Sequence, residues 1–297
     1  IPEGASAGFL NGLQHKQLVG DLFLAKRDPA KLEAAGKKAQ LATLQAIADQ
    51  GEQAFYSGAN PKAIAARVNT APRNPAPMVE SDITAYQARL RAPVCAAYRQ
   101  YRICGMGPPS SGATTVLATM GQLERFDLHA LGKDSPVAWH LIAESQRLAY
   151  ADRARYSADA DFVTVPVAGM IDRKYLAARS ALIDPAKSMP TVSAGIPPGA
   201  EKLARADAPY AEEYGTSHIA AVDRAGNAVS YTSTIESAFG SGLMVGGYFL
   251  NNELTDFDMQ AVQDGRLVAN RPESGKRPRS SMSPTLVFGP DGRLKLV

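Results

Sequence analysis

The residues whose types and spacing best suit catalysis are two threonines at the open end of a predicted β-hairpin. Residues 218–222 and 228–235 have the composition of β-strands, and a segment rich in turn-forming residues joins them. If the turn centres on Ala225 and the strands pair without a bulge, Thr216 lies opposite Thr234. Cross-strand partners have Cβ atoms roughly 4.5–5.5 Å apart, so the two hydroxyl groups could hydrogen-bond.

Thr216 could act as a nucleophile if a chain began there. An N-terminal threonine carries an α-amine with a reference pKa of about 7.7–8.0, which can take the proton of the neighbouring hydroxyl. Attack of the Thr216 hydroxyl on the carbonyl of Gly215 would give an ester, and hydrolysis of that ester would free the amine. Glu236, two residues beyond Thr234, is expected on the same strand face. On spacing alone, β-branched side chains that pack across a hairpin explain the threonine pair more simply.

Composition narrows the class of protein. The chain has 297 residues, of which 45% are apolar and 21% charged, and these values are ordinary for a globular protein. The net charge is +3 and the basic residues are scattered, which argues against a surface for nucleic acid or anionic membranes. No window approaches the ~18 apolar residues of a membrane helix. The short basic run from Lys276 to Arg279 is interpreted as a solvated loop.

Both ends of the sequence indicate a fragment of a larger protein. The chain begins Ile-Pro-Glu-Gly, without a Met-initiated basic and apolar signal segment. Near the other end, residues 285–297 are predicted to form a strand, a Gly-Pro-Asp-Gly turn and a second strand. That second strand stops while its side chains still alternate.

The two cysteines, Cys95 and Cys104, are too few for a disulfide scaffold or a zinc site. A two-residue turn at Arg99 and Gln100 would place them opposite each other as a non-hydrogen-bonded pair, where side chains approach most closely. A disulfide is therefore feasible and would suit an oxidising compartment. Two reduced, half-buried thiols fit the sequence equally well.

The first half of the chain is predicted to be mainly helical. Helix starts are indicated at Asp28-Pro29 and Asn60-Pro61. Asp82 is expected to cap a short helix that ends near Leu90. The strongest helical pattern runs from Val137 to Tyr156.

Two short polar segments could be taken for ligand sites but have simpler interpretations. Ser110 and Ser111 follow two prolines and are candidate N-caps of a helix through Phe126, because the lysine of a phosphate-binding P-loop is missing. Asp159-Ala-Asp161 is interpreted as a plain turn, because the further ligands and glycine of a calcium loop are absent.

Residues 189–215 differ in amino-acid composition from the segment before them. They are rich in proline, glycine and alanine with little periodicity, which predicts an exposed, mobile linker. Short strands and tight turns follow to the end of the sequence. Helices first and antiparallel strands afterwards predict an α+β layered domain rather than a parallel βαβ sheet.

Several segments together resemble one known family. Residues 215–223 and 226–230 resemble the processing segment of γ-glutamyltranspeptidases, and residues 249–257 and 275–285 resemble later parts of the same pattern. Upstream, residues 108–112 and 148–156 match the pattern of the family's large subunit. The segments occur in the family's order and extend over nearly the whole chain.

The resemblance implies a fold and a subunit arrangement. The fold would be α+β, a four-layer αββα sandwich of the N-terminal nucleophile (Ntn) hydrolase type, present here as a partial chain. Residues 1–215 would be the C-terminal part of the large subunit, and residues 216–297 the N-terminal part of the small subunit. Both parts would belong to one structural domain, and autoproteolysis between Gly215 and Thr216 would separate them.

The resemblance also assigns roles to residues. Thr216 matches the nucleophile and Thr234 the hydroxyl that supports it, while Ser280 and Ser281 match the pair that binds the donor's α-carboxylate. The residues matching acceptors for the donor's α-ammonium are Glu253 and Asp256. Hydroxyl groups suit a carboxylate, and anionic acceptors make strong, charge-assisted bonds to an ammonium.

The sequence departs from the family at two places. Glu236 stands where well-studied members carry asparagine, so a third carboxylate would join the ammonium site. Either one carboxylate is protonated or the site attracts cations more strongly, and donor preference could differ. Residues 258–274, where some members have a lid, are short and lack aromatic residues, which suggests an open cleft for bulkier acyl donors.

The function implied is an autoprocessing γ-glutamyl transferase or hydrolase that acts on glutathione-like γ-glutamyl amides through a γ-glutamyl ester on Thr216. The acceptor would be an amino acid, a peptide or water. No cofactor, metal, nucleic acid or membrane span is expected, and the partners would be the two subunits of one precursor. The family suggests a periplasmic or secreted location.

Three alternatives remain open. The first is a cephalosporin-acylase-like amidohydrolase of the same fold, and the second is an unprocessed or truncated, inactive homologue. The family's carboxylate-binding arginine and its Gly-Gly oxyanion hole lie outside residues 1–297, so a molecule that ended at Val297 is expected to have little activity. The third, a serine hydrolase, fits poorly, because the Gly-x-Ser-x-Gly motif is missing. The histidines also form no triad pattern; they are His15, His129, His140 and His218, the last interpreted as structural.

Overall fold

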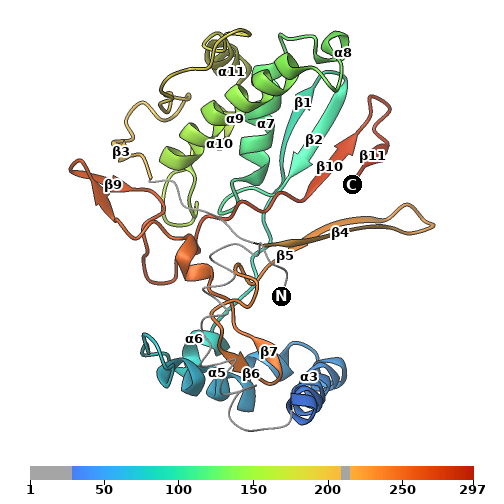
Figure 1. Ribbon diagram of the computed structural model, residues 1–297, viewed down its shortest axis with the longest axis vertical. Helices are drawn as coiled ribbons and strands as arrows, with labels where there is room; N and C mark the ends of the chain where they lie inside the picture. The colour runs from blue at the N-terminus through green and yellow to red at the C-terminus, as the bar shows by residue number, and fades with distance from the viewer. Residues whose placement is uncertain (1–28, 209–214) are drawn as a thin grey trace. The chain divides into compact units, whose positions relative to one another are not determined.

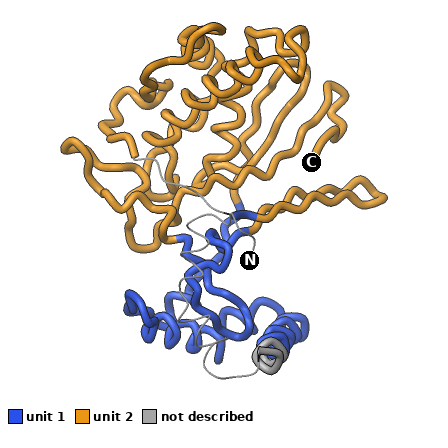
Figure 2. Tube along the Cα trace, in the orientation of Figure 1, with its two compact units in different colours: residues 1–90, 213–216, 234–253 blue, residues 91–212, 217–233, 254–297 orange. Residues whose placement is uncertain are grey.

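The computed structural model describes residues 29–208 and 215–297 (Figure 1). The chain divides into two compact units (Figure 2). The first comprises residues 1–90, 213–216 and 234–253, and the second comprises residues 91–212, 217–233 and 254–297.

The first unit is built from helices and one small hairpin. The helices are α3 (Pro29–Gln50), α4 (Gln53–Tyr56), α5 (Ala59–Asn69) and α6 (Glu80–Thr84), and the hairpin strands are β6 (Met244–Val245) and β7 (Tyr248–Phe249). The hairpin is bonded to two helices. Thr43 of α3 donates to the carbonyl of Gly246 at 3.0 Å, and the Tyr248 hydroxyl donates to the side chain of Asn60 in α5 at 2.7 Å.

The second unit contains a four-stranded antiparallel sheet with helices packed on it (Figure 1). The strand order is β1 (Val94–Tyr98), β2 (Tyr101–Gly105), β10 (Thr285–Phe288) and β11 (Leu294–Leu296). Helix α7 (Gly112–Leu123) packs on β1 and β2, and α9 (Pro136–Tyr156) packs on α7. Leu123, Leu141, Leu148 and Ile183 form a buried apolar cluster in this unit.

Shorter elements complete the second unit. The helices are α8 (Leu128–Leu131), α10 (Val167–Met170) and α11 (Arg173–Ser180). A small sheet has the order β3 (Arg205–Ala206), β9 (Arg266–Val268) and β8 (Val262–Gln263), and a separate hairpin joins β4 (Ser217–Val222) to β5 (Ala228–Ser233). A 3₁₀ turn, η2, spans Glu253–Asp256, and its first residue is the last residue of the first unit. Of the helices in residues 29–208 and 215–297, none has both the length and the apolar character needed to cross a bilayer.

The cysteine hairpin forms in the predicted register. Tyr98 pairs with Tyr101 across a two-residue turn, and Cys95 pairs with Cys104. The two sulfur atoms are joined as a disulfide, with an S–S distance of 2.08 Å. The predicted strand, turn and strand near the end of the sequence are also present, as β10 and β11.

The helix boundaries agree with the predictions in part. Helix α3 begins at Pro29, whereas the proposed cap Asp28 lies outside the described residues. The cap predicted at Asp82 is wrong, because α6 begins at Glu80 and ends at Thr84. Asp82 is the third helical residue, and its carboxylate accepts a hydrogen bond from the backbone amide of Val79 at 2.9 Å. An acidic residue there can reach back to the residue before the helix.

The prediction of an exposed, mobile linker is wrong in part for residues 189–208: some, such as Ile196, are exposed, but the segment is anchored at several points. The rest of the predicted linker, residues 209–214, lies outside the described residues. The amide of Met189 donates to Glu144, the carbonyl of Ser193 accepts from Arg179, and both backbone groups of Gly195 are bonded, each at 2.8 Å. Pro197 is also fully buried. Buried polar side chains on α9 and α11 therefore anchor this segment, and its proline-rich and glycine-rich composition gives no sign of them.

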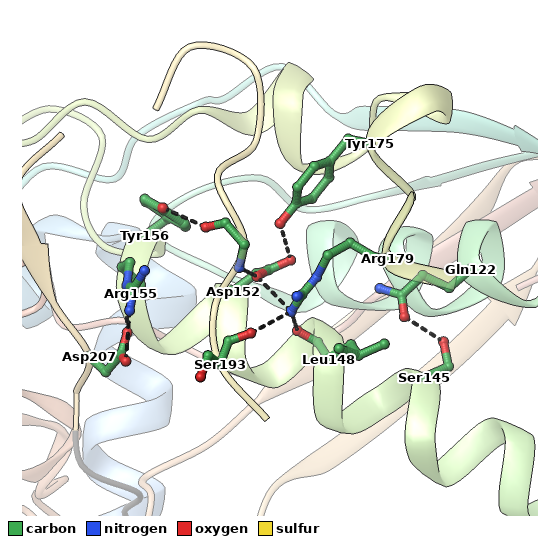
Figure 3. Close-up of polar contacts among 11 residues, drawn as sticks. Gln122, Ser145, Leu148, Asp152, Arg155, Tyr156, Tyr175, Arg179, Ser193 and Asp207 are labelled. Atoms are coloured by element: carbon green, nitrogen blue, oxygen red, sulfur yellow. Dashed lines mark hydrogen bonds and ion pairs between the residues drawn. The ribbon is translucent and has the colours of Figure 1, made fainter. Parts of the chain in front are cut away.

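A buried carboxylate, Asp152, is the centre of that anchor (Figure 3). It accepts hydrogen bonds from the Tyr175 hydroxyl at 2.7 Å, from the Gly195 amide at 2.8 Å and from Arg179 at 3.1 Å. Burial raises the pKa of the Asp152 carboxyl, while the positive charge of Arg179 acts in the opposite direction. The ion pair with Arg179 is itself buried, at 1% and 8% side-chain exposure.

We expect Arg179→Met to lower the free energy of unfolding by about 3–5 kcal/mol, because it leaves the buried Asp152 carboxylate without its cation. Arg173→Met is the matched control on the same helix, since Arg173 is 72% exposed and pairs with Glu124 at 3.2 Å. The control should change the free energy by no more than about 1 kcal/mol. Urea unfolding of the purified variants measures both values, and equal losses would contradict the assigned role of the cluster.

Candidate active site

The hairpin of β4 and β5 has the predicted register. Its paired residues run from Ser217 opposite Ser233 to Val222 opposite Ala228, so the hairpin is centred on Ala225 without a bulge. Hydrogen bonds from Asn227 stabilise the Asp223 carboxylate in the turn and lower its pKa. Thr216 and Thr234 directly flank the outermost pair, Ser217 and Ser233, so the register agrees with the prediction up to that pair.

The carbonyl that precedes Thr216 is hydrogen-bonded to Thr234. The Thr234 hydroxyl donates to the carbonyl oxygen of Gly215 at 3.2 Å and accepts from the amide of Glu236 at 2.8 Å. Gly215 and Thr216 are both exposed. A hydroxyl donor at this position withdraws electron density from the Gly215 carbonyl and would stabilise negative charge on its oxygen.

Glu236 does not continue the strand face of Thr234, so that expectation is wrong. Strand β5 ends at Ser233, and Glu236 has a φ of 69°, in the left-handed region that a strand does not use. Its buried carboxylate accepts hydrogen bonds from Ser237 at 2.7 Å and from the side-chain amide of Asn252. Strand alternation cannot be extended through a left-handed residue, so Glu236 does not share the face of Thr234.

Glu253 and Asp256 are the first and last residues of η2, and both are half-buried. The Glu253 amide donates to the side chain of Asn251 at 3.0 Å. The backbone carbonyl of Asp256 accepts from the side chain of Asn270 at 2.7 Å. These bonds fix the backbone from which each carboxylate projects.

Ser280 and Ser281 lie in a loop that is bonded to the start of α7. Both the amide and the hydroxyl of Ser111 donate to the carbonyl of Ser280, each at 2.8 Å, and the Ser280 amide donates to the carbonyl of Pro109 at 3.1 Å. Gly112 permits this close approach, because a Cβ atom there would overlap the carbonyl oxygen of Met282. Ser111 precedes α7 as predicted. Its hydroxyl does not cap the helix and instead donates to the carbonyl of Ser280.

Arg153 also contacts this loop, although it was not among the site residues predicted from the sequence. Its Nε donates to the Ser111 hydroxyl at 2.8 Å, and its Nη2 donates to the hydroxyl of Ser281. Arg153 is 6% exposed. The available signal was its place in α9, four residues after the buried Ala149 and beside the buried Asp152.

The basic run from Lys276 to Arg279 is not a solvated loop, so that interpretation is wrong. The Lys276 side chain is 0% exposed and donates to the carbonyl of Ala269 at 2.8 Å and to Glu273 at 2.7 Å. Its hydrogen bond holds the pKa of Glu273 below the usual value. The Ala269 carbonyl and the Glu273 carboxylate lie just before the run, and a count of its positive charges alone does not reveal them.

Several other polar residues have partners within the second unit. Asp159 accepts from the Arg277 amide at 2.9 Å, and Asp161 pairs with Arg91 at 2.7 Å, which agrees with a turn rather than a calcium loop. The His218 ring lies 2.7 Å from the Thr232 hydroxyl, in keeping with a structural role. Within the described ranges, no group of three or more His, Cys, Asp or Glu residues could hold a metal ion.

We expect Lys276→Met to destabilise the loop that carries the two serines. The variant keeps the length of the side chain but leaves the buried Ala269 carbonyl unsatisfied, at a cost of about 1–3 kcal/mol. Lys295→Met is the matched control, because Lys295 is 43% exposed and pairs with Asp291 on the surface; its effect should stay within about 0.5 kcal/mol. Thermal unfolding compares the two, and a K276M protein as stable as K295M would refute the buried contact.

The sequence is similar to proteins of one known family. The γ-glutamyltranspeptidase family profile matches residues 6–297. The glutathione hydrolase proenzyme of Bacillus subtilis (strain 168) is 37% identical over 279 residues, covering 91% of this chain and 46% of that protein. The corresponding proenzyme of Escherichia coli (strain K12) is 36% identical over 286 residues, covering 93% and 47%. The acylase ACY 1 proenzyme of Pseudomonas sp. (strain V22) is 36% identical over 257 residues, covering 85% and 42%.

A solved structure shows the same fold. Cephalosporin acylase from Bacillus halodurans superposes with a TM-score of 0.74 at 20% identity, covering 95% of this chain and 49% of that one. This likeness shows that the chain shares the fold of that acylase, and the mixture of helices and sheets confirms the predicted α+β class. The chain spans about half the length of the curated relatives that it matches. On the profile and these identities, the chain belongs to the γ-glutamyltranspeptidase family.

Proposed function

We propose that this chain is part of a self-processing γ-glutamyl transferase or hydrolase in which Thr216 is the nucleophile. The observation that carries the proposal is the 3.2 Å hydrogen bond from the Thr234 hydroxyl to the carbonyl of Gly215, directly before Thr216. That donor lies where negative charge must develop if the Gly215–Thr216 bond is attacked. Family membership supports the same assignment.

In the processing reaction, the Thr216 hydroxyl attacks the carbonyl carbon of Gly215. The C–N bond breaks, the nitrogen of Thr216 takes up the proton, and the acyl group is left as an ester on the Thr216 oxygen. Water then hydrolyses the ester, giving a carboxylate on Gly215 and a free amine and hydroxyl on Thr216. Residues 1–215 and 216–297 would thereafter belong to the large and small subunits.

In turnover, the α-amine of Thr216 takes the proton of its own hydroxyl, and the oxygen attacks the γ-carbonyl carbon of the donor. The donor's amine leaves with that proton, and a γ-glutamyl ester remains on Thr216. The amine of an amino acid or peptide, or water, then displaces the ester. No cofactor is required for either half of this reaction.

The remaining predicted residues would bind the donor. Ser280 and Ser281 would donate to its α-carboxylate, and Glu253 and Asp256 would accept from its α-ammonium. Glu236 would add a third negative charge, with its carboxylate oriented by Ser237 and Asn252. We further propose a periplasmic or secreted location, which suits the disulfide between Cys95 and Cys104.

We expect Thr216→Ala to abolish both processing and turnover in the full-length gene product. Thr216→Ser is the matched control, because it keeps the hydroxyl group and should still be cleaved. Intact-mass analysis reads out processing as two polypeptides that separate before residue 216, and release of an anilide chromophore reads out turnover. Cleavage at this bond or substantial activity in T216A would exclude Thr216 as the nucleophile.

A second candidate function is that of an acylase with the same mechanism and a different donor. It is favoured by the acylase ACY 1 proenzyme, whose 36% identity is nearly that of the glutathione hydrolase proenzymes. The two candidates differ in the acyl group, because a γ-glutamyl donor carries an α-ammonium that a glutaryl group lacks.

We expect the processed wild-type protein to prefer a γ-glutamyl anilide over the matching glutaryl anilide by about tenfold or more in kcat/KM. The reason is that the charge-assisted bonds to the ammonium are worth about 1.5–3 kcal/mol each. Both donors release the same chromophore, so their turnover can be compared side by side. The opposite preference would favour the acylase, and cleaved protein inactive on both donors would favour an inert homologue.

A further inference from the structure

We infer that Arg153 is a positioning residue that fixes the Ser281 hydroxyl as a hydrogen-bond donor toward the α-carboxylate of the acyl donor. The inference rests on the proposed function, in which Ser280 and Ser281 bind that carboxylate. It adds a residue on α9 that acts through Ser281 without touching the substrate.

The guanidinium group of Arg153 bridges two serine side chains in the second unit. Nε donates to the Ser111 hydroxyl at 2.8 Å, and Nη2 donates to the Ser281 hydroxyl. The guanidinium carbon lies 5.3 Å from the centre of the Tyr150 ring, which helps to hold its plane. At 6% exposure, Arg153 has little freedom to take another rotamer.

A guanidinium group can only donate hydrogen bonds, and this fixes the direction of each bond that it makes. Both serine oxygens must therefore accept from Arg153, and each serine proton must point elsewhere. For Ser111 the second bond is visible, because its hydroxyl donates to the carbonyl of Ser280 at 2.8 Å. Ser111 thus shows how Arg153 orients a hydroxyl group.

Ser281 likewise accepts a hydrogen bond from Arg153, but none of the described residues accepts one from the Ser281 hydroxyl. The side chain is partly exposed, and with Arg153 and Ser111 it lines a cavity of about 400 Å³ between α7 and α9. A hydroxyl that accepts from a cation is also a stronger donor, because hydrogen bonds in a chain polarise one another. The hydroxyl is therefore prepared to donate to an anion, as a carboxylate-binding serine must.

Without Arg153, the Ser281 hydroxyl could rotate and accept from any donor nearby. It would then present a lone pair to the incoming carboxylate as readily as a proton. The expected defect is weaker binding of donors that carry the α-carboxylate, with little change in the chemical step at Thr216. A purely structural role for Arg153 would instead impair every donor alike.

The test compares two donors in the full-length gene product. One is the γ-glutamyl anilide, and the other is the 4-aminobutyryl anilide, which lacks only the α-carboxylate. Arg153→Gln should raise KM for the γ-glutamyl anilide by about tenfold or more, the size expected for a lost hydrogen bond to a charged group. Its kcat, and kcat/KM for the 4-aminobutyryl anilide, should stay within about threefold of wild type. Arg153→Lys keeps the charge and should restore part of the loss.

A double-mutant cycle and a surface control sharpen the test. Adding R153Q to Ser281→Ala should cost no more than S281A alone, because Arg153 acts through Ser281. Arg147→Gln lies on the same helix at 40% exposure and should affect neither donor. If the 4-aminobutyryl anilide turns over too slowly, inhibition constants for free glutamate and 4-aminobutyrate give the same comparison.

The outcomes separate this inference from the proposed function. Equal loss on both donors, or losses from R153Q and S281A that add, would assign Arg153 a structural role only. Normal KM in R153Q with an active wild-type enzyme would overturn the inference and leave the function in place. A processed wild type without γ-glutamyl turnover would overturn the proposed function itself. If R153Q does not fold, the R153K and S281A arms of the cycle decide.

Discussion

The buried carboxylate of Asp152 is the constraint on which much of the second unit depends. A charged group in the interior must be surrounded by donors, and Asp152 obtains them from Tyr175, Arg179 and the backbone of Gly195. These partners come from α9, α11 and the segment after α11, so one side chain fixes three parts of the chain. The path of residues 189–195 over α9 and α11 follows from this arrangement.

The same rule operates at the serine loop with hydroxyl groups in place of a carboxylate. Arg153 donates to the hydroxyls of Ser111 and Ser281, and Ser111 in turn donates to the carbonyl of Ser280. Lys276 donates to a carbonyl slightly upstream in the sequence. The loop contains little regular structure, but these hydrogen bonds fix the orientation of its polar groups. Such a loop can hold a ligand with only a small loss of conformational entropy on binding.

Local patterns predicted the features that depend on local geometry. The register of both hairpins followed from turn chemistry and strand alternation. Cys95 therefore pairs with Cys104, and Ser217 pairs with Ser233 directly inside Thr216 and Thr234. The fold class followed from the order of helices and strands. Predictions failed where distant partners anchor a segment, as for residues 189–208. For residues 276–279, the charge pattern of the run gave no sign of the nearby carbonyl and carboxylate that bind Lys276. The strand face predicted for Glu236 was wrong because its left-handed backbone ends the strand alternation. Arg153 was not predicted as a site residue because its serine partners lie 42 and 128 residues away in the sequence.

The absence of a side chain at Gly112 has a mechanical consequence. The first turn of α7 and the backbone of Met282 are in direct contact there, with no flexible atoms between them to absorb displacement. A side chain introduced at residue 112 would have to push the backbone of Met282 and Ser283 away from the helix. Because Ser280 and Ser281 directly precede these residues, such a substitution would displace both serines together.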